Sequence, residues 1–176
     1  MTKLLGSWAL AAMICAVAPQ TVLAYDVPIQ ASFAVAFSSS PNTGNVTYCG
    51  GTPLTNAIES HGDGFSTLGA LGFSLHKTGN GQLFHGCLTL TAPNGDTLTA
   101  TYDAVGSGAN ANHFASLTGT LTFTGGTGLF SGATGSATLT AVSGPFYPAS
   151  SFVPVQGMAF YVVQGRVSIG GTGDRR

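Results

Sequence analysis

Apolar and polar residues alternate along most of the chain after residue 24, and this pattern predicts β-strands. The first run shows it clearly, because every second residue from Ile29 to Phe37 is apolar. Side chains of a strand point alternately to its two faces, so each apolar set should turn toward a common interior. Further sets with the same alternation are Phe65, Leu71, Phe73 and Leu75; Phe84, Leu88 and Leu90; Leu98, Ala100 and Tyr102; His113, Ala115, Leu117, Leu121 and Phe123; Ala137, Leu139 and Ala141; and the run 157–169.

The Gly-Asn pair at 79–80 is the expected turn between two of these strands. Both residue types tolerate the positive φ of a two-residue hairpin turn, which would place Leu75 opposite Phe84. His76 and His85 would then be diagonal neighbours on the outer, polar face of the hairpin. Because the spacing supplies no third ligand, we expect two solvent-facing histidines and no metal site.

The Pro-Asn-Gly segment at 93–95 is the next expected turn. A three-residue loop with its Gly in the left-handed conformation places Leu90 opposite Leu98. A two-residue loop would instead place leucines opposite threonines, so burial favours the three-residue loop. Nearer the C-terminus, the segment 143–156 contains three prolines, which cannot donate ladder hydrogen bonds, and we expect a long loop or lid there.

The strand pattern as a whole favours an all-β fold. About eight strands joined by short turns suit a closed antiparallel β-barrel, because closure leaves no unpaired edge strand. The alternative is an open β-sandwich, which usually needs long connections that cross between sheets. Consecutive strands here look hairpin-connected, so we expect the barrel.

Residues 1–24 have the three parts of a secretory signal peptide. They contain the positively charged Lys3, an apolar stretch, and a small-residue cleavage site that ends at Ala24. We therefore expect residues 25–176 to form a single secreted domain, either periplasmic or extracellular.

Two cysteines, Cys49 and Cys87, remain after removal of the signal peptide. Thiols pair in oxidising compartments, so we expect a disulfide between them. The alternative is a pair of unconnected buried thiols, because the sequence does not show whether the two residues come close enough to bridge.

The charge of the chain excludes one class of partner. Beyond Lys3 the chain carries four basic and six acidic side chains, with no basic patch. Nucleic-acid binding needs several Lys or Arg side chains against phosphates, so it is not expected. No apolar run long enough for a membrane helix follows the signal peptide. A surface rich in Thr, Ser, Asn and Gly is compatible with self-association.

A glycine-rich hairpin is the most specific motif of the chain. The segment 119–135, GTLTFTGGTGLFSGATG, places a glycine cluster and one large aromatic residue between two strands of alternating threonine and apolar residues. Together with Gly-Asp-Thr-Leu at 95–98, it resembles the glycine-rich hairpin of the allene oxide cyclase-like and dirigent-like barrel proteins. By this resemblance we expect the chain to be a secreted bacterial member of that family. The resemblance extends from residue 82 to residue 141.

The resemblance implies an eight-stranded barrel whose cavity accepts an apolar small molecule. In that family the motif marks a β-turn and a core phenylalanine, here Phe130. The turn glycines, which we expect to allow positive φ, are Gly125, Gly126 and Gly128. The catalytic glutamate of the family has no counterpart, because Glu59 is the only glutamate of the chain and falls in a predicted loop.

Four polar residues share the parity of the apolar interior: His61, Asp63, Tyr102 and His113. A few polar side chains that converge on an apolar cavity are typical of a ligand site. The alternative is that they are buried polar groups satisfied by backbone and water.

These observations favour a secreted, non-catalytic barrel without a cofactor. It would bind a small apolar molecule or contribute to an extracellular matrix or envelope. The alternative function is a cyclase or dirigent-type enzyme in which His113 or Asp63 acts with Tyr102 on a reactive apolar substrate.

Overall fold

The structure, a computed structural model, describes residues 24–39, 46–48, 52–54, 58–80, 82–145 and 156–170. These residues are almost entirely β-structure. The elements are β1 (Ala24–Ser39), β2 (Val46–Tyr48), β3 (Thr52–Leu54), β4 (Ile58–Ser66), β5 (Gly69–Asn80), β6 (Leu83–Thr91), β7 (Thr97–Gly106), β8 (Ser116–Gly126), the short 3-10 helix η1 (Gly128–Phe130), β9 (Thr134–Ser143) and β10 (Gln156–Gly170).

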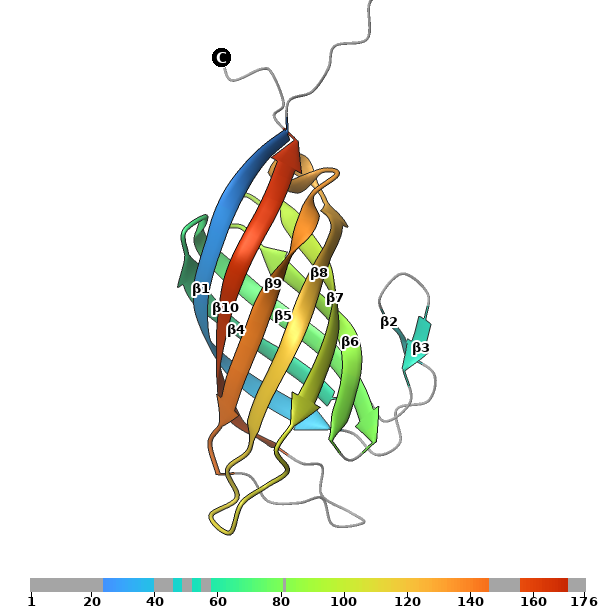
Figure 1. Ribbon diagram of the computed structural model, residues 1–176, viewed down its shortest axis with the longest axis vertical. Coiled ribbons are helices and arrows are strands. Elements are labelled where there is room, and N and C mark those ends of the chain that lie inside the picture. The colour runs from blue at the N-terminus through green and yellow to red at the C-terminus, as the bar shows by residue number, and fades with distance from the viewer. Residues whose placement is uncertain are drawn as a thin grey trace, which may run out of the picture.

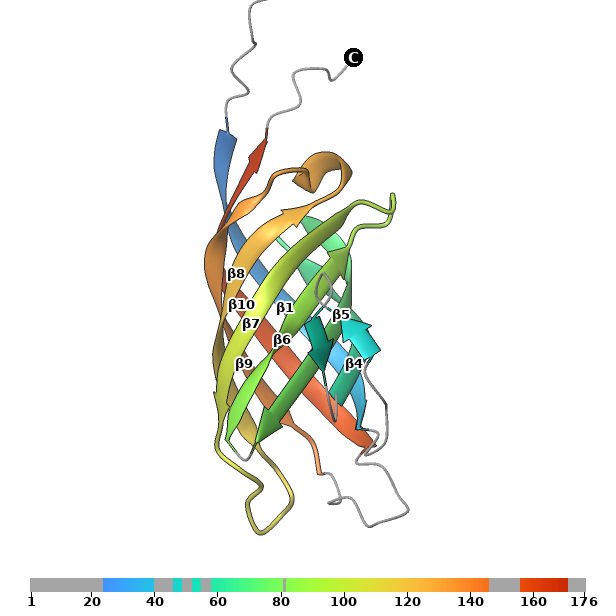
Figure 2. The same cartoon turned by 90° about the vertical axis from the view of Figure 1, so that its right-hand side faces the viewer.

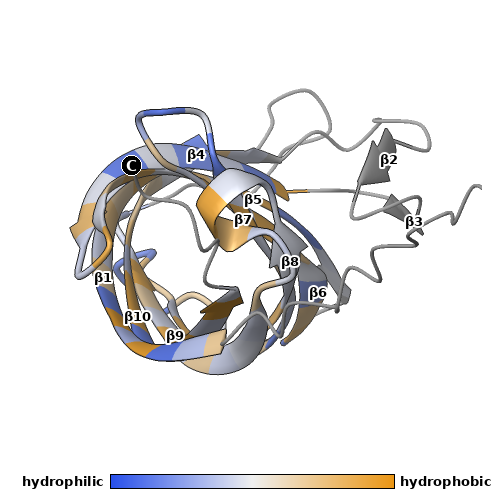
Figure 3. Ribbon diagram, turned by 90° about the horizontal axis from the view of Figure 1, so that it is seen from above, coloured by the Kyte–Doolittle hydropathy of each residue, from blue (hydrophilic) through white to orange (hydrophobic). Residues whose placement is uncertain are grey.

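Eight of the strands form a closed antiparallel barrel in the order β1-β10-β9-β8-β7-β6-β5-β4 (Figure 1). β1 pairs with β10 on one side and with β4 on the other, and this pairing closes the ring seen from above in Figure 3. The strands run obliquely around the barrel in both side views (Figure 2). β2 and β3 form a separate two-stranded sheet. The expected barrel is confirmed, and the sandwich alternative is wrong.

The apolar sets fill the barrel interior. Leu88, Leu98 and Leu121 are 1%, 1% and 0% exposed, and they belong to one continuous core. Burial of a leucine side chain stabilises a fold by about 1.5–3 kcal/mol, so these positions hold the wall of the barrel together. The predicted inward parity of the central strands is confirmed.

The β5–β6 hairpin differs from the prediction. Residues 79 and 80 belong to β5 rather than to the turn, because Asn80 pairs with Leu83, and Leu75 pairs with Leu88 rather than with Phe84. The register shift is even, so every side chain keeps its predicted face. In the observed register, Leu75 pairs with Leu88 and Phe73 pairs with Leu90 on the interior face.

The inward position predicted for Phe65 is wrong. Its side chain is 79% exposed, and it pairs with Ala70 near the β4–β5 turn. The inward positions of β4 include Gly64, where an added Cβ would lie 2.5 Å from Cδ1 of Phe33. The Phe33 ring already fills that part of the interior, and a phenylalanine from β4 has no room there.

The loop at 93–95 agrees with the prediction. Leu90 pairs with Leu98, and Gly95 adopts a φ of +89°. β9 ends at Ser143 and β10 begins at Gln156, as expected for a connection there, although residues 146–155 lie outside the described residues. So do Cys49 and the predicted signal peptide up to residue 23. In the part of the chain that the structure describes, no helix has the length and apolarity needed to span a membrane.

The glycine-rich hairpin seals one end of the barrel. Phe130 in η1 is 1% exposed, and η1 packs against β7, β8 and β10. Gly125 and Gly128 have φ values of +140° and +52°, as expected. Gly126 does not adopt a positive φ; instead, a Cβ there would lie 2.8 Å from Cβ of Phe130, so this glycine permits close packing.

Candidate functional site

A cavity of about 310 Å³ lies at the opposite end of the barrel from η1. It is found where β7 passes into β8, and residues of the 107–115 connection contribute to its wall. The wall is mostly apolar and includes Phe37, Phe84 and Leu117. Ligand sites in proteins are typically concave, largely apolar and about 300–1,000 Å³ in volume, so this cavity has the size and character of a small-molecule site.

A lysine lies on the inner wall of this cavity. Lys77 follows the inward residues Leu71, Phe73 and Leu75 of β5 and is only 7% exposed. Its Nζ donates a hydrogen bond of 3.3 Å to Oη of Tyr161 on β10. Nζ also lies 5.2 Å from the ring centroid of Phe84 and 5.9 Å from that of Tyr161, within reach of a cation–π interaction.

Glycines make room for the Phe84 ring beside this lysine. Gly79 pairs with Phe84 across the β5–β6 hairpin, and a Cβ at Gly79 would lie 2.6 Å from Cδ1 of the ring. At the end of β7, a Cβ at Gly106 would lie 2.8 Å from Cε2 of the same ring. Because both positions lack a side chain, the ring can lie against the barrel wall, next to Lys77.

Two buried hydroxyls add polar character to the interior. Tyr102 is 1% exposed and Ser60 is 0% exposed, and neither hydroxyl has a hydrogen-bond partner among the described residues. Burial raises the pKa of Tyr102 above its ordinary value, and Tyr161 raises it further. The Tyr102 hydroxyl therefore stays neutral and can donate a hydrogen bond.

The structure does not bring the four predicted site residues together. Tyr102 lies inside the barrel as predicted, but His61 and Asp63 lie on the outer face of β4. The His61 side chain is 59% exposed, and its Nε2 lies 4.0 Å from a Glu59 carboxylate oxygen. The inward positions beside them belong to Ser60 and the glycines of β4, so the predicted parity of this strand is wrong.

His113 lies in the connection between β7 and β8 rather than at the start of a strand. Its φ of +62° breaks the alternation, and its backbone N–H donates to the carbonyl of Asn110 at 2.9 Å. Strand parity therefore gives no inward direction to this side chain, and the predicted grouping of His113 with Tyr102 is not found.

Within the described ranges, the buried polar side chains that the sequence analysis did not single out include Lys77, Ser60 and Tyr161. The signal for Lys77 was available, because it continues the alternation of Leu71, Phe73 and Leu75 by one further step. A lysine at the end of an apolar strand face is easily taken for the point where the strand reaches solvent. No comparable signal marked Ser60, because the predicted register placed its neighbours inside.

The two histidines of the β5–β6 hairpin face outward as expected. His85 contacts Asp103 on β7. Nε2 of His76 lies 3.2 Å from Oγ of Ser74, and its ring centroid lies 5.6 Å from that of His61. Burial lowers the pKa of His76. Over the described ranges, no three His, Cys, Asp or Glu side chains are arranged to hold a metal ion.

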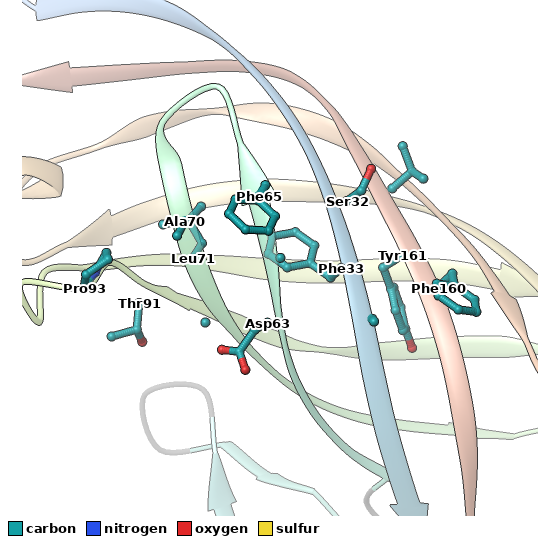
Figure 4. Close-up of a pocket in the computed structure, with 14 residues that line it drawn as sticks. Ser32, Phe33, Asp63, Phe65, Ala70, Leu71, Thr91, Pro93, Phe160 and Tyr161 are labelled. Carbon is teal, nitrogen blue, oxygen red and sulfur yellow. The ribbon is translucent and has the colours of Figure 1, made fainter.

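An open groove of about 910 Å³ crosses the outer face of β10, β1, β4 and β5 (Figure 4). Phe65 and Phe160 contribute to it and are 79% and 65% exposed, with the small residue Ala34 and the carboxylate of Asp63 also in the wall. The groove is more open to solvent than the cavity at the barrel end. The cavity, with the buried Lys77 at its wall, is therefore the better candidate for a small-molecule site.

No family model matches this chain, and no curated protein matches its sequence. Among solved structures, the chain is similar to the pterocarpan synthase dirigent protein GePTS1, with a TM-score of 0.43 and 15% sequence identity over 89% of this chain and 91% of that one. The strand pairing itself establishes the barrel.

Proposed function

We propose that this protein is a secreted, non-catalytic barrel that binds a small, largely apolar molecule in the cavity at the end opposite η1. We call this end of the barrel, where the cavity lies, the open end. The cavity carries the proposal: about 310 Å³ of mostly apolar space with Lys77 and Tyr161 at its wall. A few polar groups in an apolar cavity fix the orientation of a ligand, while the apolar wall supplies most of the binding free energy.

The side chains at the cavity favour binding over catalysis. The described residues that line it include no carboxylate and no imidazole. Acid–base catalysis most often uses such groups, within hydrogen-bond reach of the substrate. The enzyme alternative relied on Asp63 or His113 next to Tyr102, and these residues lie on different parts of the barrel.

Export and a disulfide are part of the same proposal. The N-terminal signal pattern supports export, and the expected bridge would join Cys87 of β6 to Cys49. Mass spectrometry of the protein from a culture expressing the full chain tests both points. We expect an N-terminus at Tyr25 and a mass lower by two hydrogens than that of the reduced protein. An unprocessed N-terminus or two free thiols would contradict this part of the proposal.

Binding can be tested with the neutral fluorescent probe N-phenylnaphthylamine, with one variant that fills the cavity and one matched control. Ala141 points into the cavity, so Ala141→Phe should reduce its free volume. Thr140 is the preceding residue on β9 and points outward, so Thr140→Phe adds the same ring outside the barrel. We expect probe fluorescence to increase with the wild type and Thr140→Phe and to stay low with Ala141→Phe. No binding by the wild type, or equal binding by Ala141→Phe, would contradict the proposal.

A structural role in a matrix or envelope is the second candidate, and the outer groove favours it. Exposed apolar patches often mark contacts between proteins, and Phe65 and Phe160 form such a surface. Sedimentation velocity over a range of concentrations tests self-association. A monomer at all concentrations would remove this candidate, whereas assembly that Phe160→Ser abolishes would support it.

A further inference from the structure

The ammonium of Lys77 has no carboxylate partner in the described part of the chain. The chain has six acidic residues, and five of them are described. Asp26 accepts a hydrogen bond from Arg166 at 2.6 Å, and Asp103 contacts His85. These two carboxylates lie on the outer face of the barrel, with exposed side chains.

The other described carboxylates also lie away from Lys77. Glu59 and Asp63 belong to the outer face of β4 or its groove, and Asp96 lies in the turn that holds η1 at the sealed end. The sixth, Asp174, lies outside the described residues, beyond the end of β10 at Gly170. That end of β10 pairs with the start of β1, at the other end of the barrel from the cavity.

The hydrogen bonds of Lys77 are therefore incomplete. An ammonium has three N–H donors, and within the described residues Tyr161 Oη accepts one of them, at 3.3 Å. The rings of Phe84 and Tyr161 offer weaker cation–π attraction. A buried cation is costly unless an anion or several hydrogen bonds compensate it, and the cavity is the space into which such a partner fits.

We propose that Lys77 binds the acid group of the ligand, so that the cavity selects apolar molecules that carry a carboxylate over neutral molecules of the same shape. This inference rests on the proposed function, because it assigns the polar end of the ligand whose apolar body contacts Phe84 and Leu117. A carboxylate can accept a charge-assisted hydrogen bond from Nζ, which is shorter and stronger than a bond between neutral groups. The neighbouring Tyr161 hydroxyl can donate a second bond to the same group.

A matched pair of ligands tests the proposal: naphthoate, which is ionised near neutral pH, and naphthamide, which has the same shape and no charge. Their affinities are measured by displacement of N-phenylnaphthylamine. We expect the wild type to bind naphthoate at least about tenfold more tightly than naphthamide, as expected for a hydrogen bond to a charged group. Equal affinities in the wild type would overturn the proposal without any variant.

Two variants test whether Lys77 causes the preference for naphthoate over naphthamide. Lys77→Met removes the interior charge, and Arg166→Met removes one charge from the outer face as a matched control. We expect Lys77→Met to keep binding naphthamide and to lose the preference for naphthoate, while Arg166→Met keeps it. A preference that persists in folded Lys77→Met, verified by circular dichroism, would overturn the proposal. If Lys77→Met does not fold, Lys77→Gln takes its place.

The outcomes also separate this inference from the proposed function. If the wild type binds the neutral probe in the cavity but does not distinguish the two ligands, only the role of Lys77 is wrong. If it binds neither the probe nor either ligand, the proposed function is wrong as well.

Discussion

The two ends of the barrel are built in opposite ways. At the sealed end, η1 places Phe130 in the core, and the carboxylate of Asp96 accepts hydrogen bonds of 3.0 Å from the backbone N–H of Leu129 and from the side chain of Asn94. At the open end, glycines make room for the Phe84 ring, and a buried lysine lies at the wall of a cavity. At the sealed end a carboxylate is hydrogen-bonded within the chain, whereas at the other end, among the described residues, the Lys77 ammonium has one hydrogen bond, to Tyr161.

This contrast separates stability from binding. A fully packed end with satisfied hydrogen bonds contributes to the free energy of unfolding, and truncation there should be costly. An end with an uncompensated buried charge costs stability in the absence of a ligand and gains it when an anion is bound. Substitution of a buried side chain should therefore lower the free energy of unfolding at the sealed end and raise it at Lys77 of the open end.

The largest effect is expected from Phe130→Ala at the sealed end. The variant leaves a cavity in the core, and the free energy of unfolding should fall by about 3–5 kcal/mol in urea denaturation. Phe160→Ala, on the outer face, is the matched control and should change it by less than about 0.5 kcal/mol. A similar loss in both variants would show that Phe130 does not hold the sealed end.

At the open end, Lys77→Met should have the opposite sign. It replaces a buried ammonium with an apolar side chain of similar length, so the free energy of unfolding should rise by about 1–3 kcal/mol without ligand. The measurement is urea denaturation near neutral pH, with Arg166→Met as the control for loss of a surface charge. A less stable Lys77→Met protein would mean that the lysine is well compensated in the fold.

Asp96→Ala tests the hydrogen bonds that hold η1. Its carboxylate accepts bonds from Leu129 and Asn94, and their loss should lower the free energy of unfolding by about 1–2 kcal/mol. Probe binding at the open end should change by less than about twofold, because distant sites act independently. A large change in binding with unchanged stability would contradict the separation of the two ends.

The smallest effect is expected from Tyr102→Phe in the interior between the ends. The hydroxyl has no partner among the described residues, so the free energy of unfolding near neutral pH should change by less than about 1 kcal/mol. Burial raises the pKa of Tyr102 above the value of 10.0 for an exposed tyrosine, so the unfolded chain loses its proton first as pH rises. Wild-type stability should then fall above that pH, and the variant should lose less. Equal losses in both would contradict the assignment.

Much of the fold could be predicted because one physical rule governs most strands. Where two strands pair in an unbroken register, as β6 and β7 do at Leu90 and Leu98, parity and turn chemistry give the same answer. The rule failed for Phe65, where the Phe33 ring of a strand distant in sequence occupies the interior. Phe33 and Phe65 compete for the same interior space only because the barrel is closed, and the local sequence gives no information about closure.

The candidate site was harder to predict for the same reason. Tyr102 was placed inside correctly, since β7 alternates without interruption. His61 and Asp63 were predicted inside because the alternation of β5 was extended back through the β4–β5 turn, and that turn reverses it. His113 was predicted inside because the strand was expected to include it, whereas β8 begins only at Ser116. Lys77 was overlooked because a charged residue after a run of apolar positions usually marks the place where a strand leaves the core. Here the strand continues to Asn80.

A titration of isotopically labelled protein with naphthoate, followed by NMR, tests the central claim most directly, because it locates the ligand. We predict that the largest shifts of backbone amides fall at the open end, around Phe84, Gly106 and Leu117, and that η1 stays unchanged. Shifts centred on Phe65 and Phe160 of the outer groove, or no shifts at all, would contradict the claim that the open end of the barrel is the binding site.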